Sequence, residues 1–509
     1  MTLAVTMTHG VLGTLLDDWS SLGLGTLLHV VLASLVTLHN LREPREPRST
    51  LLWIYLAWAL PGVGALLYLA FGVNRIPVKG WQKQRSDQSF WEARRDQVAA
   101  SHPLAYWRGL QNALQTSPEH PSDLELNQIL DKLHPGHPLL GGNSIAIHTD
   151  GDEAYPAMLE AIAKARHHIH LQSYIIGHDA VGRHFLDRLA QQARAGVRVR
   201  LLYDDFGSGK ARLTGLFLRY RCVPNLQIVG FSQVNPIKRQ FQLNLRNHRK
   251  LLIVDGHIGF IGGMNISAIH GHPDRDRAGI RDYHFAVRGP IVLALQYTFL
   301  RDWYYMTDEN ADRLLSQDHF PQIEARGDAA IRIVNAGPTS EREALCDANF
   351  ALIGTARSQV LLGTPYFVPP DDMRRALRVA ALRGIDVRLL IPVRTNHLST
   401  TYAARAGYEE MLAAGVRIFL RRPPFMHSKF LMIDGRTAMV GTANFDNRSL
   451  KLNYETNLIV FDHAFSDRFK QRVLNDYANA DELHLDAWRR RPRAQRLVEN
   501  FFNLASPAL

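Results

Sequence analysis

Two short stretches of the chain carry a histidine, a lysine and an aspartate at the same spacing. The first is NHRKLLIVDG, residues 247–256, and the second is MHSKFLMIDG, residues 426–435. In each stretch a His-x-Lys pair opens an apolar run typical of a buried strand, which ends at an Asp-Gly turn. Side chains at positions i and i+2 of a strand point to the same face, so each histidine shares a face with its lysine.

The two stretches belong to a longer internal repeat. Five polar or glycine positions recur with a constant offset of 179: His248 with His427, Lys250 with Lys429, Asp255 with Asp434, Gly262 with Gly441, and Asn265 with Asn444. A repeat of this length indicates a duplicated lobe rather than a short-period solenoid. We therefore predict a pseudo-dimer of two similar lobes, with one shared site at the pseudo-two-fold axis.

The residue types that would meet in this shared site suit phosphodiester chemistry. Two lysines form a tight anion site, and a phosphodiester also requires a nucleophile and a proton donor, which two histidines can supply. Asn265 and Asn444 follow short predicted strands. Their amides could donate hydrogen bonds to non-bridging oxygens and stabilise a five-coordinate transition state.

Other kinds of site are less consistent with the sequence. Lysine is not a normal metal ligand, and no cluster of histidines and carboxylates has metal-site spacing, so we expect neither a metal nor a cofactor. His167, His168 and His170 are interpreted as a solvated helix end that runs into a strand. GSGK at 207–210 lacks the rest of a phosphate-binding loop and predicts a turn. The only cysteines, Cys222 and Cys346, are too few for a disulfide framework or a zinc site.

Composition and element order give the fold class. A chain of 509 residues is long enough for two or more domains, and its formal charge of +11 favours anionic partners. HHIHLQSYII, VGRHFLDRLAQQARAG and VRVRLLYDD predict a strand, a helix and a strand. QVLLGTPYFV, DDMRRALRVAALRG and IDVRLLIPV repeat that order in the second half. The sequence therefore predicts two α/β lobes.

The N-terminal part predicts a membrane hairpin. Residues 51–71 form an uncharged apolar run of 21 residues, long enough to cross a hydrocarbon core roughly 30 Å thick. Residues 22–41 are also uncharged but contain His29, His39 and several glycines, so this segment is either a first span or an interfacial helix. A slight excess of Lys and Arg after the second span favours a cytoplasmic body.

These motifs and their flanking segments resemble the phospholipase D superfamily, and within it most closely the bacterial cardiolipin synthases. The duplicated H-x-K-x4-D with a following G-[GT]-x-N carries the superfamily resemblance. The hairpin with PGVGALLYLAFG, and segments such as YDDFGS, GTPYFVP and NFDNRSLKLNYETNL, carry the resemblance to the branch. IRDYH departs from it, because a Trp often precedes that Arg-Asp pair. The resemblance covers nearly the whole chain.

The resemblance implies a role for each repeated residue. His248 is expected to be the nucleophile that becomes phosphorylated and His427 the acid and base, although the near symmetry leaves the reverse order open. The groups expected to bind the phosphate are Lys250, Lys429, Asn265 and Asn444.

The resemblance also implies carboxylates that support these groups. In the family a carboxylate shortly after each motif orients the imidazole of that motif, and Asp282 and Glu455 occupy these places. A carboxylate that accepts the second ring N–H fixes the tautomer of the imidazole. Asp255 and Asp434 complete the two catalytic motifs, but we expect them mainly to shape the turns that end the strands.

The reaction that the resemblance implies is phosphatidyl transfer. One phosphatidylglycerol gives its phosphatidyl group to a histidine and releases glycerol, and a second phosphatidylglycerol takes the group to form cardiolipin. The partner is then anionic phospholipid rather than nucleic acid. Transfer to another alcohol or to water remains an alternative, as does a nuclease of the same superfamily. A catalytically silent membrane scaffold is disfavoured because both motifs are intact.

The expected organisation follows from these assignments. We predict a membrane hairpin over residues 1–75, a connector over 76–140, a first lobe over 141–325 and a second lobe over 326–509. The location implied is the bacterial inner membrane, with more than one span. The C-terminal segment WRRRPRAQRLVENFF either lies on an anionic membrane surface or packs as a solvated basic helix onto a core.

Overall fold

The structure is a computed structural model of the chain. It describes residues 25–42, 47–72, 83–90, 92, 116–118, 120–134, 136–231, 234–235, 240–241, 245–271, 279–316, 318–338, 341 and 343–504. These residues form two compact units, 1–79 and 80–509, and each unit is described by itself. About half of the predicted connector, and the start of the predicted first span, lie outside the described residues.

The first unit is a helical hairpin. Residues 25–42 form a helix, and α2 (Pro47–Ala59), α3 (Val63–Leu67) and a π turn (Tyr68–Gly72) follow it. A small apolar core joins the two arms through Ala33, Val36, Ala57, Ala65 and Tyr68.

The predicted span at 51–71 is not one continuous helix. α2 ends at Ala59, and a turn at Leu60–Gly62 separates it from α3. Pro61 has no N–H to continue the helical hydrogen bonds, and Gly62 takes a positive φ of 69°. Among the helices in the described part of the chain, none combines the length and the apolar character needed to cross a membrane.

The first half of the second unit alternates strands with helices. Its helices are α6 (Pro121–Leu133), α7 (Asp150–Ala163), α8 (Ala180–Arg194), α9 (Gly209–Leu213), α10 (Ile291–Thr307) and α11 (Ala311–Leu314), with 3-10 turns at Leu216–Tyr220 and Ala268–His270. Its strands are β1 (Leu140–Thr149), β2 (His168–Ser173), β3 (Arg198–Asp204), β4 (Leu226–Phe231), β5 (Val234–Asn235), β6 (Gln240–Phe241), β7 (Leu251–Val254), β8 (Ile258–Gly262), β9 (Ile280–Arg281) and β10 (Tyr283–Arg288).

The second half repeats this order. Its helices are α12 (Ala344–Thr355), α13 (Asp371–Leu382), α14 (Leu398–Ala406), α15 (Tyr408–Ala413), α16 (Asn447–Lys451), α17 (His463–Ala478), α18 (Leu485–Arg489) and α19 (Arg493–Asn503). Its strands are β11 (Ala329–Ala336), β12 (Gln359–Gly363), β13 (Phe367–Val368), β14 (Asp386–Pro392), β15 (Arg417–Arg421), β16 (Phe425–Met426), β17 (Phe430–Ile433), β18 (Thr437–Gly441), β19 (Phe445–Asp446), β20 (Glu455–Phe461) and β21 (Ala480–Leu483).

In the large sheet, the strands of the two halves follow the same kind of order, each read from its outer edge to the centre. From one edge inward the first half runs β4-β3-β2-β7-β8-β10-β1, and from the other edge the second half runs β21-β15-β14-β12-β17-β18-β20-β11. β1 and β11 pair antiparallel where the halves meet, with Leu140 opposite Ile331. The prediction of two duplicated α/β lobes is confirmed, while the exact lobe boundaries stay a prediction.

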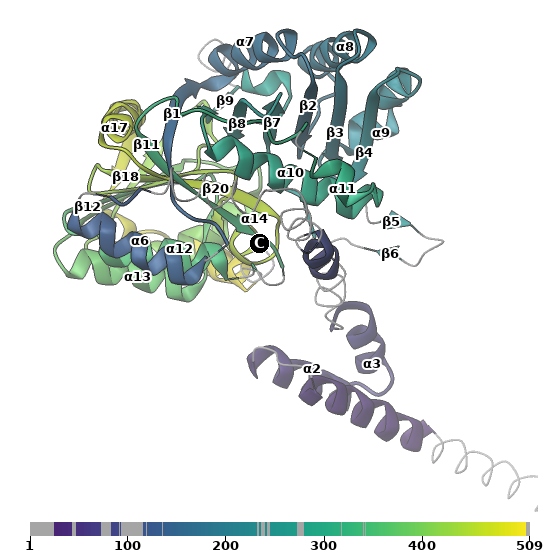
Figure 1. Cartoon of the computed structure of the whole chain (residues 1–509). Helices are drawn as coiled ribbons and strands as arrows, with labels where there is room; N and C mark the ends of the chain where they lie inside the picture. The colour runs from purple at the N-terminus through teal and green to yellow at the C-terminus, as the bar shows by residue number, and fades with distance from the viewer. Residues whose placement is uncertain are drawn as a thin grey trace, which may run out of the picture. The chain divides into compact units, whose positions relative to one another are not determined.

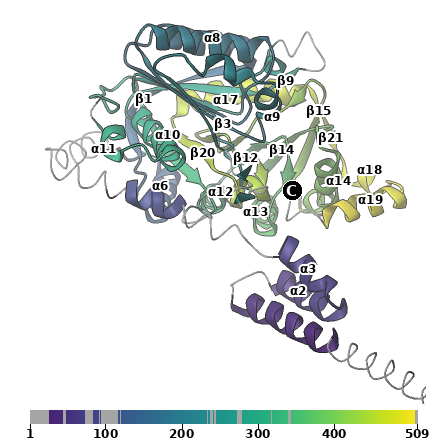
Figure 2. The same ribbon diagram turned by 90° about the vertical axis from the view of Figure 1, so that its right-hand side faces the viewer.

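The core follows from this arrangement, because neighbouring side chains of a strand point to opposite faces. On β7, Leu252 packs with α7 and α8, whereas Leu251 and Ile253 face the core that contains α10. That α10 core continues into the second half through Phe465 and Phe469 of α17. Figure 1 shows α7 and α8 on the outside of the first half and α12 and α13 on the outside of the second, and Figure 2 shows α8, α12 and α13 from the side. The two halves therefore share one continuous interior.

Candidate active site

Each motif histidine is held by backbone from the opposite half of the molecule. The N–H of His248 donates to the carbonyl of Tyr454 at 2.9 Å, and the N–H of His427 donates to the carbonyl of Arg281 at 2.8 Å. These contacts extend a parallel bridge between Asn247 and Tyr454 and the parallel pair β16–β9. The histidines thus sit at two equivalent places where the halves interlock.

The carboxylates are exchanged between the halves. Nδ1 of His248 lies 2.9 and 3.0 Å from the carboxylate oxygens of Glu455, and Nδ1 of His427 lies 2.8 Å from Oδ2 of Asp282. Asp282 and Glu455 do orient the imidazoles, but each orients the one of the other motif. The expectation that each carboxylate serves its own motif is therefore wrong.

The backbone register explains the exchange. Asp282 immediately precedes β10 and Glu455 opens β20, and these strands pair with β8 and β18 of their own halves. The start of each strand reaches past its own sheet to the interlocking bridge described above. Glu455 directly follows Tyr454, and Asp282 directly follows Arg281, the two residues whose carbonyls accept from the histidine N–H groups. Each carboxylate therefore meets the histidine of the other half.

The two lysines lie just behind the histidines. Nζ of Lys250 donates to the carbonyl of His248 at 2.7 Å, and Nζ of Lys429 donates to the carbonyl of His427. Nζ of Lys429 also lies 2.8 Å from Nδ1 of His427, a contact that has no counterpart among the hydrogen bonds of Lys250 in the described residues. Both lysines are almost fully buried.

Burial and mutual charge set the pKa values of these groups. Burial lowers the pKa of Lys250 to about 7 and that of Lys429 to about 8. Burial also lowers the pKa of His248 and His427, and the lysine charges lower them further. Both imidazoles are consequently neutral near pH 7, the form in which a ring nitrogen can act as a nucleophile.

The pKa values of the two carboxylates are shifted in opposite directions. Burial raises the pKa of Asp282. Burial alone would also raise the pKa of Glu455, but the charge and hydrogen bond of His248, with Lys250, bring its pKa below the usual value. Glu455 also accepts from the Thr442 hydroxyl at 2.6 Å and from the Asn453 amide at 3.2 Å. More donors therefore stabilise the anion of Glu455 than that of Asp282.

The two motif asparagines line the same cleft as the histidines. Oδ1 of Asn265 accepts from the N–H of Ile175 at 3.1 Å, which leaves the NH₂ end of the amide for the cleft. Oδ1 of Asn444 is buried and has no hydrogen-bond partner among the described residues. The positions fit the expectation that the amides donate to a phosphate, which stays a prediction.

The motif aspartates lie away from the cleft and hold turns. Asp255 accepts hydrogen bonds from the backbone N–H groups of residues 166–168, and Asp434 accepts them from those of residues 357–359. Both take a positive φ of 53°, a conformation that asparagine and aspartate tolerate better than most residues. Each aspartate fastens the start of a neighbouring strand, so its contacts are structural.

The cleft between the halves has a volume of about 660 Å³. His248, His427, Asn265 and Asn444 all line it, together with residues from both halves. The ring of Tyr174 packs edge-on to His248, with centroids 5.0 Å apart. The arrangement provides two neutral imidazoles, two amides and two nearby ammonium groups around one space large enough for a phosphodiester headgroup.

Comparisons with known proteins agree with this geometry. The family model described as "Cardiolipin synthase, PLD-like domain" matches residues 158–270 and 350–477, and a "Phospholipase_D-nuclease N-terminal" model matches residues 29–72. A cardiolipin synthase of Geobacillus thermodenitrificans is 35% identical over 98% of this chain and 97% of its own length. The chain belongs to the cardiolipin synthase family. Cardiolipin synthase 2 of Bacillus anthracis is 34% identical over 92% of this chain and 88% of its own.

A solved structure supports the fold assigned to this family member. The phosphatidylserine synthase of Haemophilus influenzae superimposes with a TM-score of 0.58, covering 76% of this chain and 100% of that chain at 13% identity. At this identity the likeness concerns the fold alone.

Several cleft residues were not singled out from the sequence. Arg246 and Arg448 line the cleft, and so does His270, whose ring centroid lies 6.0 Å from that of His427. Arg246 stands two positions before His248, and Arg448 four positions after Asn444. A basic residue close to each motif was the available signal. His270 has no counterpart in the repeat, so the alignment of the two halves could not reveal it.

Other candidate groups lie apart from the cleft. His168 and His170 are fully buried beside Gln296 and His319, so their interpretation as a solvated helix end is wrong. The described residues contain no group of three or more His, Cys, Asp or Glu side chains arranged to hold a metal. In GSGK, Gly207 and Ser208 lie in a turn, as predicted, whereas Gly209 and Lys210 begin α9.

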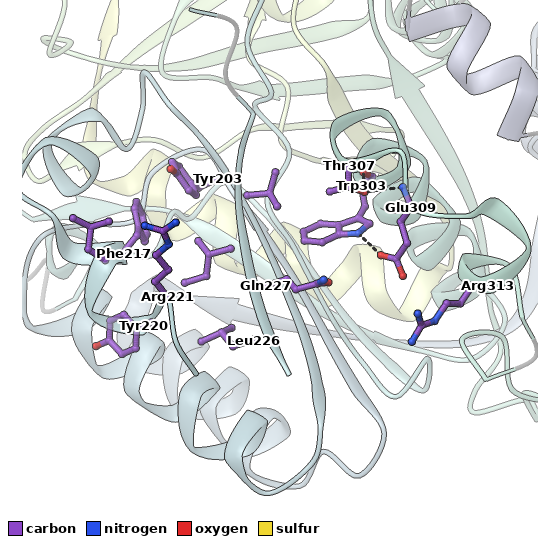
Figure 3. A pocket seen from close by; sticks show the side chains of 13 residues that line it. Tyr203, Phe217, Tyr220, Arg221, Leu226, Gln227, Trp303, Thr307, Glu309 and Arg313 are labelled. Carbon is purple, nitrogen blue, oxygen red and sulfur yellow. Dashed lines mark hydrogen bonds between the residues drawn. The ribbon is translucent and has the colours of Figure 1, made fainter. Parts of the chain in front are cut away.

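A second cavity, of about 650 Å³, lies at the outer edge of the first half (Figure 3). Tyr203 and Phe217 form one wall, and Trp303 donates to Glu309 at 2.9 Å on the other. None of the motif residues lines it.

Proposed function

We propose that this chain is a cardiolipin synthase that transfers a phosphatidyl group from one phosphatidylglycerol to another. The observation that carries the proposal is the interlocked pair His248–Glu455 and His427–Asp282 at one cleft. Two neutral histidines with separate carboxylate partners provide a nucleophile and an acid that act on the same phosphorus atom. The names of the relatives support the choice of phosphatidylglycerol as the substrate.

His248 is the nucleophile of the proposed first step. Glu455 accepts the proton on Nδ1, which leaves the lone pair of Nε2 for attack on phosphorus. The P–N bond forms as the bond from phosphorus to the glycerol oxygen breaks. The anion of Glu455 stabilises the positive charge that develops on the imidazole during this step.

His427 is the proton donor of the same step. It gives a proton to the departing glycerol oxygen, and the charge on Lys429 and Lys250 makes that proton acidic. A bound phosphodiester adds negative charge and raises the pKa of His427, so the histidine takes up its proton when the substrate is present. The proton is therefore available at the moment when a leaving group needs it.

The second step returns the enzyme to its starting state. His427, now neutral, accepts the proton from a hydroxyl of the second phosphatidylglycerol, and the hydroxyl oxygen attacks the phosphorus of the phosphatidyl-histidine. The P–N bond breaks and His248 is regenerated. Two phosphatidylglycerols thus give one cardiolipin and one glycerol.

Lys250, Lys429, Asn265 and Asn444 stabilise the phosphate in this proposal. The lysine ammonium groups lie close enough to the histidines to influence their pKa values, although neither lysine lines the cleft. They act through charge, and the asparagine amides act by direct donation. Asp255 and Asp434 contribute by holding the turns.

We further propose that residues 25–72 attach the enzyme to the bacterial inner membrane, with the body on the cytoplasmic side. Exposed leucines along both arms of the hairpin, including Leu27, Leu35, Leu51 and Leu66, support an apolar environment for it. Proximity to the membrane would concentrate the acceptor lipid relative to water. A synthase needs that advantage because water always competes for the phosphatidyl-enzyme.

The proposal is tested with the purified full chain and phosphatidylglycerol alone. We expect cardiolipin and glycerol in equal amounts and little phosphatidic acid. Added glycerol should drive the reaction backward, because the phosphodiester consumed and the one formed are similar in energy. Phosphatidic acid as the main product, unaffected by glycerol, would show a hydrolase, and cleavage of DNA without lipid products would show a nuclease.

A further inference from the structure

The C-terminal helix α19 packs with its polar side inward. Glu499 is only 1% exposed, where it pairs with Arg491 at 2.6 Å and accepts from Gln495 at 3.1 Å. Leu497 and Phe501 point outward and are 70% and 68% exposed. This is the reverse of an ordinary surface helix, which buries its apolar stripe and exposes its charges.

The outward apolar side chains form one continuous face. Leu497, Phe501 and Leu504 recur at the spacing of helical turns, with Val498 beside them. All four are exposed, and Leu504 is exposed to 79%. No described residue covers this face, which we call the α19 face. Contiguous exposed apolar side chains mark a surface that binds something.

Positive charge surrounds the α19 face. Residues 485–504 contain five arginines and two acidic residues. Three arginines have exposed side chains here: Arg489, which ends α18 and pairs with Glu409 at 3.2 Å, Arg490 in the turn that follows, and Arg493, which begins α19. An apolar helix face beside exposed arginines is the pattern of helices that lie in the headgroup region of anionic membranes.

The α19 face lies next to the active-site cleft. Phe502, on the inward side of α19, stacks on Tyr402 of α14, with ring centroids 5.5 Å apart. The first turn of α14 and the residues before it line the cleft through His397, Ser399 and Thr400. Leu398, between them, is 66% exposed. One short helix therefore joins the α19 face to the edge of the cleft.

We propose that the α19 face docks onto an anionic phospholipid bilayer and so turns the cleft toward the lipid headgroups. The proposal rests on the proposed function, because a phospholipid substrate must reach the cleft from a bilayer. Two further apolar side chains that line the cleft, Phe206 and Ile269, are also exposed. A second copy of the chain fits less well, because a symmetric contact would bring the two sets of arginines together.

A dye at the α19 face tests the docking without relying on activity. The full chain with Cys222→Ser and Phe501→Cys, labelled with an environment-sensitive dye, is reconstituted into vesicles of phosphatidylglycerol and phosphatidylcholine. The matched control carries the dye at Lys164→Cys, an exposed position in the first half. With brominated acyl chains, emission from position 501 should fall by about half, and emission from position 164 should fall by less than about a tenth.

The lipid composition sharpens this measurement. Quenching at position 501 should weaken clearly in vesicles of phosphatidylcholine alone, because the arginines then have no anionic surface to bind. Equal emission with and without brominated chains would overturn the proposal. Shielding of the dye that depends on protein concentration and not on bromination would also overturn it, in favour of a second copy as the occupant.

Activity gives a second, independent measurement. Leu497→Glu with Phe501→Glu should lower the rate on phosphatidylglycerol vesicles by about tenfold and leave the rate on monomeric short-chain phosphatidylglycerol unchanged. Leu213→Glu, which changes an equally exposed leucine elsewhere, should affect neither rate. An equal loss on both substrates would contradict the docking role. Absence of synthase activity in the unmodified chain would refute the proposed function instead, while the dye experiment would still decide the docking.

Discussion

The two catalytic halves present the same backbone to the cleft but surround their carboxylates differently. Glu455, supplied by the second half, accepts hydrogen bonds from His248, Thr442 and Asn453. Asp282, supplied by the first half, contacts Nδ1 of His427 and accepts a hydrogen bond from the backbone N–H of Tyr283. The residue that corresponds to Thr442 in the repeat is Gly263, which has no hydroxyl to donate.

The lysines repeat this difference. Lys250 contacts the carbonyl of His248, whereas Lys429 contacts both the carbonyl and Nδ1 of His427. Nδ1 of His427 also lies 2.8 Å from Oδ2 of Asp282, so this nitrogen has two protein partners and Nε2 is the nitrogen left for proton transfer. His248, with the anion of Glu455 at Nδ1, keeps its Nε2 unprotonated. The first histidine is therefore suited to attack and the second to proton transfer.

This contrast separates the features that the two halves share from those that differ between them. The repeated backbone places both histidines, and single substitutions then divide their roles. Gly263 also makes room for Asp282, because a Cβ at this position would lie 2.3 Å from Oδ1 of Asp282. A threonine like Thr442 could not occupy that position without moving the carboxylate away from His427.

The largest expected effect comes from removing either histidine. His248→Ala and His427→Ala should each reduce turnover by more than about 100-fold, because both groups act in one site on successive steps. Only the His427→Ala enzyme should accumulate phosphatidyl-enzyme from phosphatidylglycerol labelled in its phosphate. Labelled enzyme from His248→Ala instead would reverse the roles assigned to the two halves.

The exchanged carboxylates should differ in their effect. Glu455→Gln should lower the rate of phosphatidyl-enzyme formation by roughly 100-fold, because an amide cannot stabilise the positive imidazole as an anion does. Asp282→Asn should lower it by roughly tenfold, because fewer hydrogen-bond donors stabilise the anion of Asp282 than that of Glu455. Single-turnover measurements on both variants provide the comparison, and equal losses would contradict the assigned division of roles.

Much of the fold could be predicted because its signals are local. The alternation of apolar strands and amphipathic helices, and the constant offset between Lys250 and Lys429, required only the sequence. The break in the expected span at Pro61 was less visible, because proline is tolerated in many membrane helices. The helix stops before Pro61 because the backbone turns at Gly62, and a hydropathy pattern carries no information about that turn.

The repeat brought together His248, His427, Asn265 and Asn444, which line one cleft, but it did not predict how the histidines pair with the carboxylates. His248 and Glu455 are 207 positions apart, and only the interlocking of two halves brings them together. A repeat aligned on itself suggests pairing within each copy, so the exchange had to come from three-dimensional contacts. His168 and His170 were misjudged for a similar reason, because α10 and His319, which bury them, come from a distant part of the chain.

The pH dependence of kcat/KM distinguishes the lysines of the two halves. Above pH values of about 7 for Lys250 and about 8 for Lys429, the free enzyme loses the charges that attract the phosphate. kcat/KM for phosphatidylglycerol should therefore fall as the pH rises, by about tenfold per unit once either lysine is neutral. His248 must be neutral to attack, so its lowered pKa places the loss of activity on the acid side below pH 6.5.

Arginine variants show which lysine causes each part of the fall in kcat/KM at high pH. Lys250→Arg should move its lower portion to higher pH, and Lys429→Arg its upper portion, because arginine stays charged. The larger side chain will reduce the absolute rates, so the shape of the profile is the quantity to compare. A fall that stays in place in both variants would show that another group loses its proton there.

The smallest expected effect concerns stability and again separates the halves. His168 and His170 on β2 and His319 beside them are buried, and burial lowers the pKa of each, for His319 to about 3. The corresponding positions on β12 are Gln359 and Leu361, which do not titrate. Below pH 6.5 these histidines bind protons in the unfolded chain but stay neutral in the folded one. The first half should therefore lose stability as the pH falls from 6.5.

Hydrogen exchange of the two equivalent strands measures this difference. Each neutral histidine contributes at most about 1.4 kcal/mol per pH unit below its unfolded pKa, so β2 amides should lose protection relative to β12 amides between pH 7 and pH 5. Arg200 donates to both His170 and His319 at 3.1 Å, which holds these imidazoles in their neutral form. His170→Leu, which copies Leu361, should reduce the gap between the strands. If β2 and β12 lost protection equally, the acid sensitivity would have to come from groups that the two halves share.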